Sequence, residues 1–120
     1  MPTTNAGNFI SLDEAINITS AFRKGKDLIL NPNYVGKGIL PICETFDRGL
    51  FEKILQQEGC TGLRIYNSMD DSYKLHTVIV GVNAKNEDML PSNTSDNGNQ
   101  IIEQGERCPD VCPPPSALNS

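Results

Sequence analysis

The C-terminal tail holds the residues with the clearest chemical potential. Cys108 and Cys112 are separated by three residues and each is followed by proline. This spacing is within the range that structural zinc sites tolerate, but a tetrahedral site needs four ligands. The remaining ligands would come from Cys60, Cys43 or His76, the chain's only histidine. One hypothesis is therefore a zinc site formed by Cys108, Cys112, Cys60 and His76.

Two other interpretations of the tail cysteines remain open. The thiols could pack as small apolar groups that anchor an extended tail, or they could form a reversible disulfide across residues 109–111. Four cysteines in 120 residues are too few for a disulfide scaffold. We expect free thiols in a reducing compartment.

A second candidate site lies on a predicted strand. Arg64 and Tyr66 occupy alternate positions, so they share one face and could line a polar groove together with His76. The simpler interpretation is that such residues solvate the sheet. A Cys60–His76 nucleophile pair has no further support in the sequence, and a lone histidine in a strand is more often a satisfied structural residue.

Composition narrows the classes of partner. Ten basic and fifteen acidic residues give a net charge of −5, which argues against nucleic acid and against an anionic membrane surface. No apolar segment approaches the length of a membrane span, and the first eight residues lack an export-signal pattern. We expect a cytoplasmic protein. No glycine-rich phosphate loop or nucleophilic serine elbow occurs, so the sequence leans away from an enzyme.

The best-defined structural element is a β-hairpin. Residues 62–67 and 73–82 are rich in β-branched and aromatic side chains, and the Ser/Asp-rich residues 68–72 between them favour a turn. Apolar side chains lie on both faces of the second strand, which indicates a central strand. If nothing in the chain covers the face that Val78, Val80 and Val82 share, a homodimer is expected.

Two helices flank the hairpin in the sequence. Ser11 and Glu14 form a capping-box pattern before a helix expected over residues 12–24. Its apolar stripe is expected to pack on the sheet and consists of Leu12, Ala15, Ile16, Thr19 and Phe22.

The second helix has clear signals at both ends. Asp47 is a suitable N-cap, and Phe46 and Phe51 are spaced as a hydrophobic staple. Gly59 favours termination and leads into the first strand of the hairpin.

The remaining segments carry weaker signals. Residues 28–30 and 38–40 are short apolar pieces that could be edge strands or buried loop anchors. Residues 92–100 are polar and predict a loop, and residues 101–102 predict a brief strand or anchor. The proline-rich tail predicts extended backbone.

The later part of the chain resembles a set of short, uncharacterised bacterial proteins. The shared pattern is Phe46, a helix, Gly59-Cys60, Gly62-Leu63-Arg64-Ile65-Tyr66-Asn67, Val80-Gly81-Val82, Glu87-Asp88-Met89 and Cys108-Pro109-x-x-Cys112-Pro113. The resemblance covers roughly residues 46–113 and carries over no catalytic or binding residue. It lowers the expectation of an enzyme.

Together these patterns predict an α+β fold in which two helices pack on a small, mainly antiparallel sheet centred on the hairpin. Residues 1–104 are expected to form a single domain, with residues 105–120 as an extended tail. The leading hypothesis for function is a non-catalytic binding or protein-interaction module with a protein or small-molecule partner. The alternative is a thiol or structural-zinc protein that uses the tail cysteines.

Overall fold

The computed structural model describes residues 6–92 and 98–120, and the chain divides into two compact units. The first unit is built mainly from Phe46–Ser68 and His76–Gly105, and the second from Asn8–Thr45, Met69–Leu75 and Glu106–Ser120. Most of the polar loop predicted at residues 92–100, namely residues 93–97, lies outside the described residues. None of the described helices has the length and apolar composition needed to cross a membrane.

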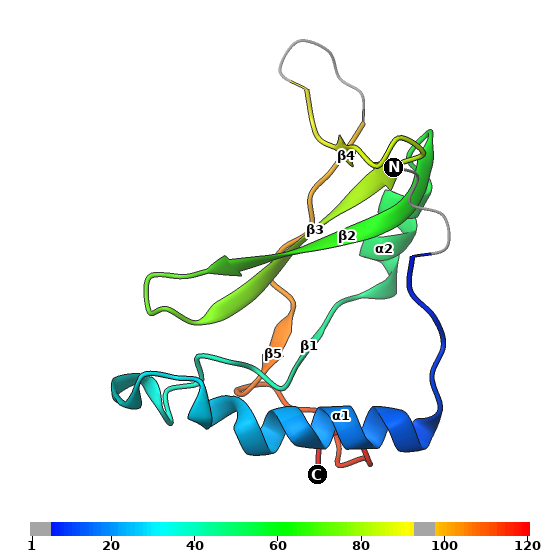
Figure 1. Cartoon of the computed structure of the whole chain (residues 1–120). Helices are drawn as coiled ribbons and strands as arrows, with labels where there is room; N and C mark the ends of the chain where they lie inside the picture. Colours follow the sequence, from blue (N-terminus) through cyan, green and yellow to red (C-terminus); the bar gives the residue numbers. More distant parts are fainter. Residues whose placement is uncertain (1–5, 93–97) are drawn as a thin grey trace. The chain divides into compact units, whose positions relative to one another are not determined.

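Within the described residues, two α-helices and two small antiparallel sheets confirm the α+β class (Figure 1). The strands form one sheet of three and another of two, where the sequence suggested a single sheet. The predicted boundary between a domain of residues 1–104 and a tail of residues 105–120 stays a prediction.

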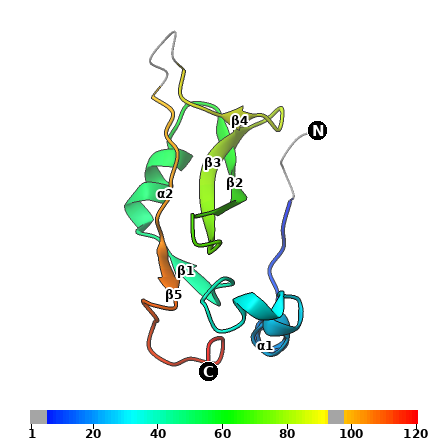
Figure 2. The same ribbon diagram turned by 90° about the vertical axis from the view of Figure 1, so that its left-hand side faces the viewer.

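The first unit contains most of the predicted hairpin, and the hairpin turn, within Met69–Leu75, belongs to the second unit. Its sheet has the order β2-β3-β4, with strands β2 (Cys60–Met69), β3 (Leu75–Asn83) and β4 (Asp88–Met89). β2 and β3 run side by side in Figures 1 and 2. β4 pairs antiparallel with β3 and places Asp88 opposite Val82. β3 is therefore the central strand, as its two apolar faces predicted.

Helix α2 (Arg48–Leu55) begins at the predicted cap. The Asp47 carboxylate accepts a hydrogen bond from the Gly49 backbone N–H at 3.2 Å. The rings of Phe46 and Phe51 stack with centroids 5.8 Å apart, which confirms the hydrophobic staple. Both signals fix the direction in which the helix leaves the preceding chain.

The core of the first unit joins α2 to the sheet. Its buried centre is Ile54 of α2, Ile79 of β3 and Ile102, with Phe46, Phe51, Cys60 and Leu63 packed around it. Ile79 and Ile102 exchange two backbone hydrogen bonds of 2.9 Å, so residues 101–102 do act as an anchor. Ile102 therefore ties the chain after the polar loop to the central strand.

Two glycines allow this packing. Gly59 has a φ of +88°, a backbone conformation that glycine adopts without steric cost, and it ends the turn after α2. A Cβ at Gly81 would lie 3.0 Å from the Cys60 Sγ and 3.2 Å from the Ile54 Cγ2. The central strand can thus approach α2 closely because this position has no side chain.

The second face of β3 is buried at two of its three valines, and Val78 is half-buried. Val80 and Val82 are each only 2% exposed. The condition under which the sequence predicted a homodimer, an uncovered valine face, is therefore not met at these two positions. Any case for a dimer has to come from another part of the molecule.

The second unit begins with helix α1 (Leu12–Gly25). The Ser11 hydroxyl accepts from the Glu14 N–H and donates to the Glu14 carboxylate, both at 3.1 Å, so Ser11 is confirmed as the N-cap and Glu14 as its side-chain partner. The expected burial of its apolar stripe on the sheet is wrong, because no α1 residue is buried. α1 belongs to the second unit, and the buried core around Ile54, Ile79 and Ile102 takes no residue from it.

The rest of the second unit consists of short elements. They are the 3₁₀ helices η1 (Lys26–Leu28) and η2 (Pro32–Tyr34) and the strands β1 (Cys43–Thr45) and β5 (Glu106–Cys108). β1 and β5 pair antiparallel (Figure 2). Of the two short apolar pieces, residues 28–30 form no strand and Leu28 is exposed, whereas Ile39 is buried as a loop anchor.

Replacing Ile54 by alanine tests the core assignment. Ile54 is 1% exposed, and deletion of a buried branched side chain costs about 2–5 kcal/mol. We expect urea unfolding to show a loss of that size in the free energy of unfolding. The matched control is Leu55→Ala in the same helix, because Leu55 is 50% exposed and its truncation should cost less than about 1 kcal/mol. Equal losses in the two variants would contradict the core assignment.

Candidate functional site

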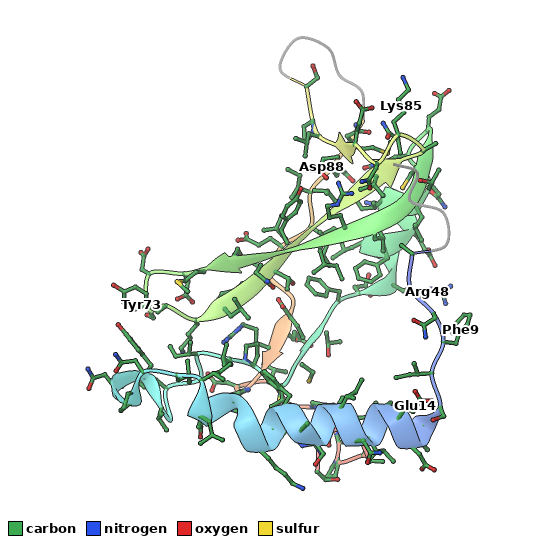
Figure 3. All side chains as sticks on the ribbon, in the orientation of Figure 1. Phe9, Glu14, Arg48, Tyr73, Lys85 and Asp88 are labelled. Carbon is green, nitrogen blue, oxygen red and sulfur yellow. A yellow bond between two sulfur atoms is a disulfide. The ribbon has the colours of Figure 1, made fainter. Side chains whose placement is uncertain are left out.

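Arg64 and Tyr66 converge on one carboxylate. Arg64 Nη1 donates to Asp88 Oδ1 at 2.6 Å, and the Tyr66 hydroxyl donates to Asp88 Oδ2. Arg64 also donates to the side-chain oxygen of Asn86 and, at 3.3 Å, to its backbone oxygen. Asp88 is labelled in Figure 3, at the start of β4. The two residues predicted to share a strand face thus form one polar network with β4.

The network shifts the ionisation of its members. The pKa of Asp88 is lowered, first by the hydrogen bond from Tyr66 and then by that from Arg64. The same hydrogen bonds to Asp88 raise the pKa of Arg64 and of Tyr66, because both protons are held by a carboxylate. At neutral pH the network therefore contains a carboxylate, a guanidinium and an uncharged phenol.

Asp88 was not singled out from the sequence as a candidate site residue. Asp88 follows a tight turn in which the Asn83 side-chain oxygen accepts from the N–H groups of Lys85 and Glu87, at 2.9 and 3.0 Å. A two-residue strand has no periodicity to read. The available signal was Asn83, since asparagine favours this kind of turn and would return the chain alongside β3.

The cysteines divide between the units. Cys60 packs against the core of the first unit, with its Sγ 3.2 Å from the Gly62 carbonyl oxygen. In the second unit Cys108 and Cys112 form a disulfide with a Cα–Cα distance of 4.5 Å, and Cys43 of β1 lies opposite Cys108 of β5. The expectation of four free thiols is therefore wrong for the tail pair, whereas Cys43 and Cys60 are free.

The proposed zinc ligands are divided between the two units. Cys108 and Cys112 are close but oxidised, and Cys60 and His76 belong to the other unit. In the part of the chain that the structure describes, no group of three or more His, Cys, Asp or Glu side chains could hold a metal ion. A zinc role would require reduced Cys108 and Cys112 and stays a prediction. His76 lies half-buried in β3, and its role in binding also stays a prediction.

No protein-family model, curated protein sequence or solved structure matches this chain. The function therefore has to be inferred from its own side chains and strand edges.

β2 offers one further feature, an open edge. It is the outer strand of the β2-β3-β4 sheet, and no other described strand pairs with its second edge. The exposed fraction is 62% for Ile65 and 44% for Tyr66 at the middle of this strand. A long edge strand presents unpaired N–H and C=O groups that another strand can bind, and proteins usually protect it with lysine, proline or a bulge. Residues 60–69 contain neither lysine nor proline.

The polar network should make stability depend on Asp88 and on pH. A carboxylate whose pKa is lowered on folding stabilises the protein above its unfolded pKa, near 3.8, and this contribution disappears as pH falls through the lower folded pKa. We therefore expect Asp88→Asn to lower the free energy of unfolding at pH 7. The difference from wild type should narrow below pH 3.8, as measured by urea unfolding across pH 7 to 3.

The control is Asp71→Asn in the exposed hairpin turn, which changes the same functional group outside the network. It should leave the stability difference small at both ends of the pH range. A deficit in Asp88→Asn that stays constant down to pH 3 would show that the carboxylate charge does not stabilise the fold.

Proposed function

We propose that this chain is a small, non-catalytic interaction module that pairs with a second copy of itself through the open edge of β2. The observation that carries the proposal is a ten-residue outer strand with exposed apolar and aromatic side chains and no protecting lysine or proline. Addition of a strand at such an edge is a common mode of protein recognition. Antiparallel pairing of two β2 strands would join the two sheets into one.

The backbone direction supports pairing centred on Ile65. The Asp70 N–H donates to the Lys74 carbonyl oxygen across the hairpin at 3.1 Å, so it points toward the partner strand. Backbone groups of successive residues point to opposite sides of a strand. Ile65 lies five positions before Asp70, an odd number. If the alternation is unbroken, the N–H and C=O of Ile65 therefore point away from β3, to the open edge. Two copies of Ile65 could then exchange a pair of hydrogen bonds on the dimer axis.

The side chains agree with this register. In antiparallel pairing about Ile65, Arg64 lies opposite Tyr66 of the second copy, and Leu63 lies opposite Asn67. A guanidinium beside a tyrosine ring is a favourable neighbour, and no like charges face each other. The polar networks of the two copies would lie next to each other on the same face. The surface is thus complementary to itself.

The cysteine chemistry bears on the location of the module. Cys43 and Cys60 are free thiols, as is usual in reducing compartments, and disulfides in such compartments are usually transient or redox-active. We propose a cytoplasmic location on this ground. The Cys108–Cys112 pair would then be an exchangeable disulfide and not a permanent structural one.

Replacing Ile65 by lysine tests the interface. Two lysines would face each other on the twofold axis, and like charges at directly opposed positions are unfavourable. We expect native mass spectrometry to show a wild-type dimer of two 13.1-kDa chains, and the variant to dissociate at least about tenfold more readily, a change of about 1.4 kcal/mol. The matched control is Ile101→Lys, at an exposed isoleucine outside β2, and it should remain dimeric.

Two results would overturn this assignment. The first is a wild-type chain that stays monomeric up to its solubility limit. The second is a dimer that survives Ile65→Lys but is lost on Ile18→Lys, because that result would move the interface to the exposed apolar side chains of α1.

A further inference from the structure

Two of the four cysteines lie in the β1–β5 sheet, and a third, Cys112, is bonded to one of them. Cys43 and Cys108 are directly opposed in the antiparallel register, so their side chains point to the same side of the sheet. The Cβ atoms of such a pair are about 4.5–5.5 Å apart, and a disulfide requires roughly 3.5–4.5 Å. A free thiol therefore lies beside a disulfide, with only a small movement needed for a bond between Cys43 and Cys108.

The two disulfide sulfurs belong to residues in different environments. Cys108 is only 4% exposed, whereas Cys112 is exposed. The Val111 N–H donates to the Arg107 carbonyl oxygen at 2.8 Å and closes the turn that holds Cys112 next to the sheet. Cys108 is thus accessible mainly from within the fold, and Cys112 faces solvent.

A cavity of about 260 Å³ lies beside this disulfide, and its walls include Ile42, Cys108, Cys112, Pro113 and Pro115. It belongs entirely to the second unit. Its volume is close to the lower end of ligand pockets, about 300 Å³, so it can hold part of a small thiol or disulfide. It leaves room at Cys112 for a low-molecular-weight thiol or disulfide.

We propose that Cys43, Cys108 and Cys112 form a thiol–disulfide exchange site for low-molecular-weight disulfides. The Cys43 thiol gives its proton to water, and its thiolate attacks the Cys108 Sγ. The Cys43–Cys108 bond forms, the Cys108–Cys112 bond breaks, and Cys112 leaves as a thiolate. This step exchanges one disulfide for another and needs no external oxidant.

The released thiolate then reacts with the external substrate. Cys112 attacks one sulfur of a small disulfide R–S–S–R, forms Cys112–S–S–R and releases R–S⁻, which takes a proton from water. Cys112 is oxidised in this step and one sulfur of the small disulfide is reduced. Cys43 acts as the internal thiol that makes Cys112 available.

Peptide mapping can distinguish the two disulfide isomers. The protein is incubated with oxidised glutathione, quenched in acid, blocked with N-ethylmaleimide and digested with trypsin. Cleavage after Lys37, Arg48 and Arg107 places Cys43 in peptide 38–48 and both tail cysteines in peptide 108–120. We expect a cross-link between the two peptides in which Cys112 carries glutathione. The starting disulfide instead lies within peptide 108–120.

Variants make the test decisive. Cys43→Ser should abolish both the cross-link and the glutathione on Cys112, whereas Cys60→Ser, the other free cysteine, should retain both. Cys112→Ser should form the Cys43–Cys108 disulfide directly when oxidised by glutathione disulfide. The proposal is overturned if no Cys43–Cys108 bond forms in wild type or in Cys112→Ser. It is also overturned if Cys43→Ser acquires glutathione on Cys112 as readily as wild type.

Discussion

The arrangement of the second unit depends on the guanidinium of Arg107. Its Nε donates to the Leu75 carbonyl oxygen at 2.7 Å, and its Nη2 donates to those of Gly38 and Ile39 at 2.9 and 3.2 Å. The Leu75 N–H in turn donates to the Ile39 carbonyl oxygen at 2.8 Å. Three segments far apart in the sequence are thereby joined through one side chain. Hydrogen bonds to a charged group contribute about 1.5–3 kcal/mol each, and this unit needs them because Ile39 and Cys108 are its only buried apolar residues within the described part of the chain.

The same side chain holds the strand that carries Cys108. Arg107 is the middle residue of β5 and lies opposite Glu44 of β1. Its bonds to Leu75 and Ile39 hold β5 in place, and the register that follows sets Cys43 opposite Cys108. A shift of one residue would move one of the two cysteines to the other face of the sheet. The positions of the sulfur atoms are thus set by a cation that has no part in sulfur chemistry.

The sequence was informative where a signal is local and periodic. The Ser11 N-cap and the Phe46–Phe51 staple join residues a few positions apart, and the hairpin strands adjoin along the chain; all three were predicted correctly. The sequence was uninformative where a strand is short and the strand that pairs with it lies far away in the chain. β1 and β5 have three residues each and lie about 60 residues apart, so neither periodicity nor spacing could reveal that Cys43 faces Cys108. The carbonyl partners of Arg107 leave no trace in residue types, because every residue has a carbonyl group.

The two possible disulfides, Cys108–Cys112 and Cys43–Cys108, close loops of very different length, and this difference links their exchange to folding. A disulfide stabilises a fold largely by restricting the unfolded chain, and this effect grows with the loop that it closes. The Cys108–Cys112 bond spans a separation of four residues, which corresponds to about 2 kcal/mol in the chain-entropy model. A Cys43–Cys108 bond would close a loop of about 65 residues, which corresponds to about 4 kcal/mol. An unfolded chain therefore prefers the short loop, and only the pairing of β1 with β5 makes the long one competitive. A Cys43–Cys108 bond would then mark a chain in which β1 and β5 are paired, whereas the Cys108–Cys112 bond is compatible with the paired sheet as well.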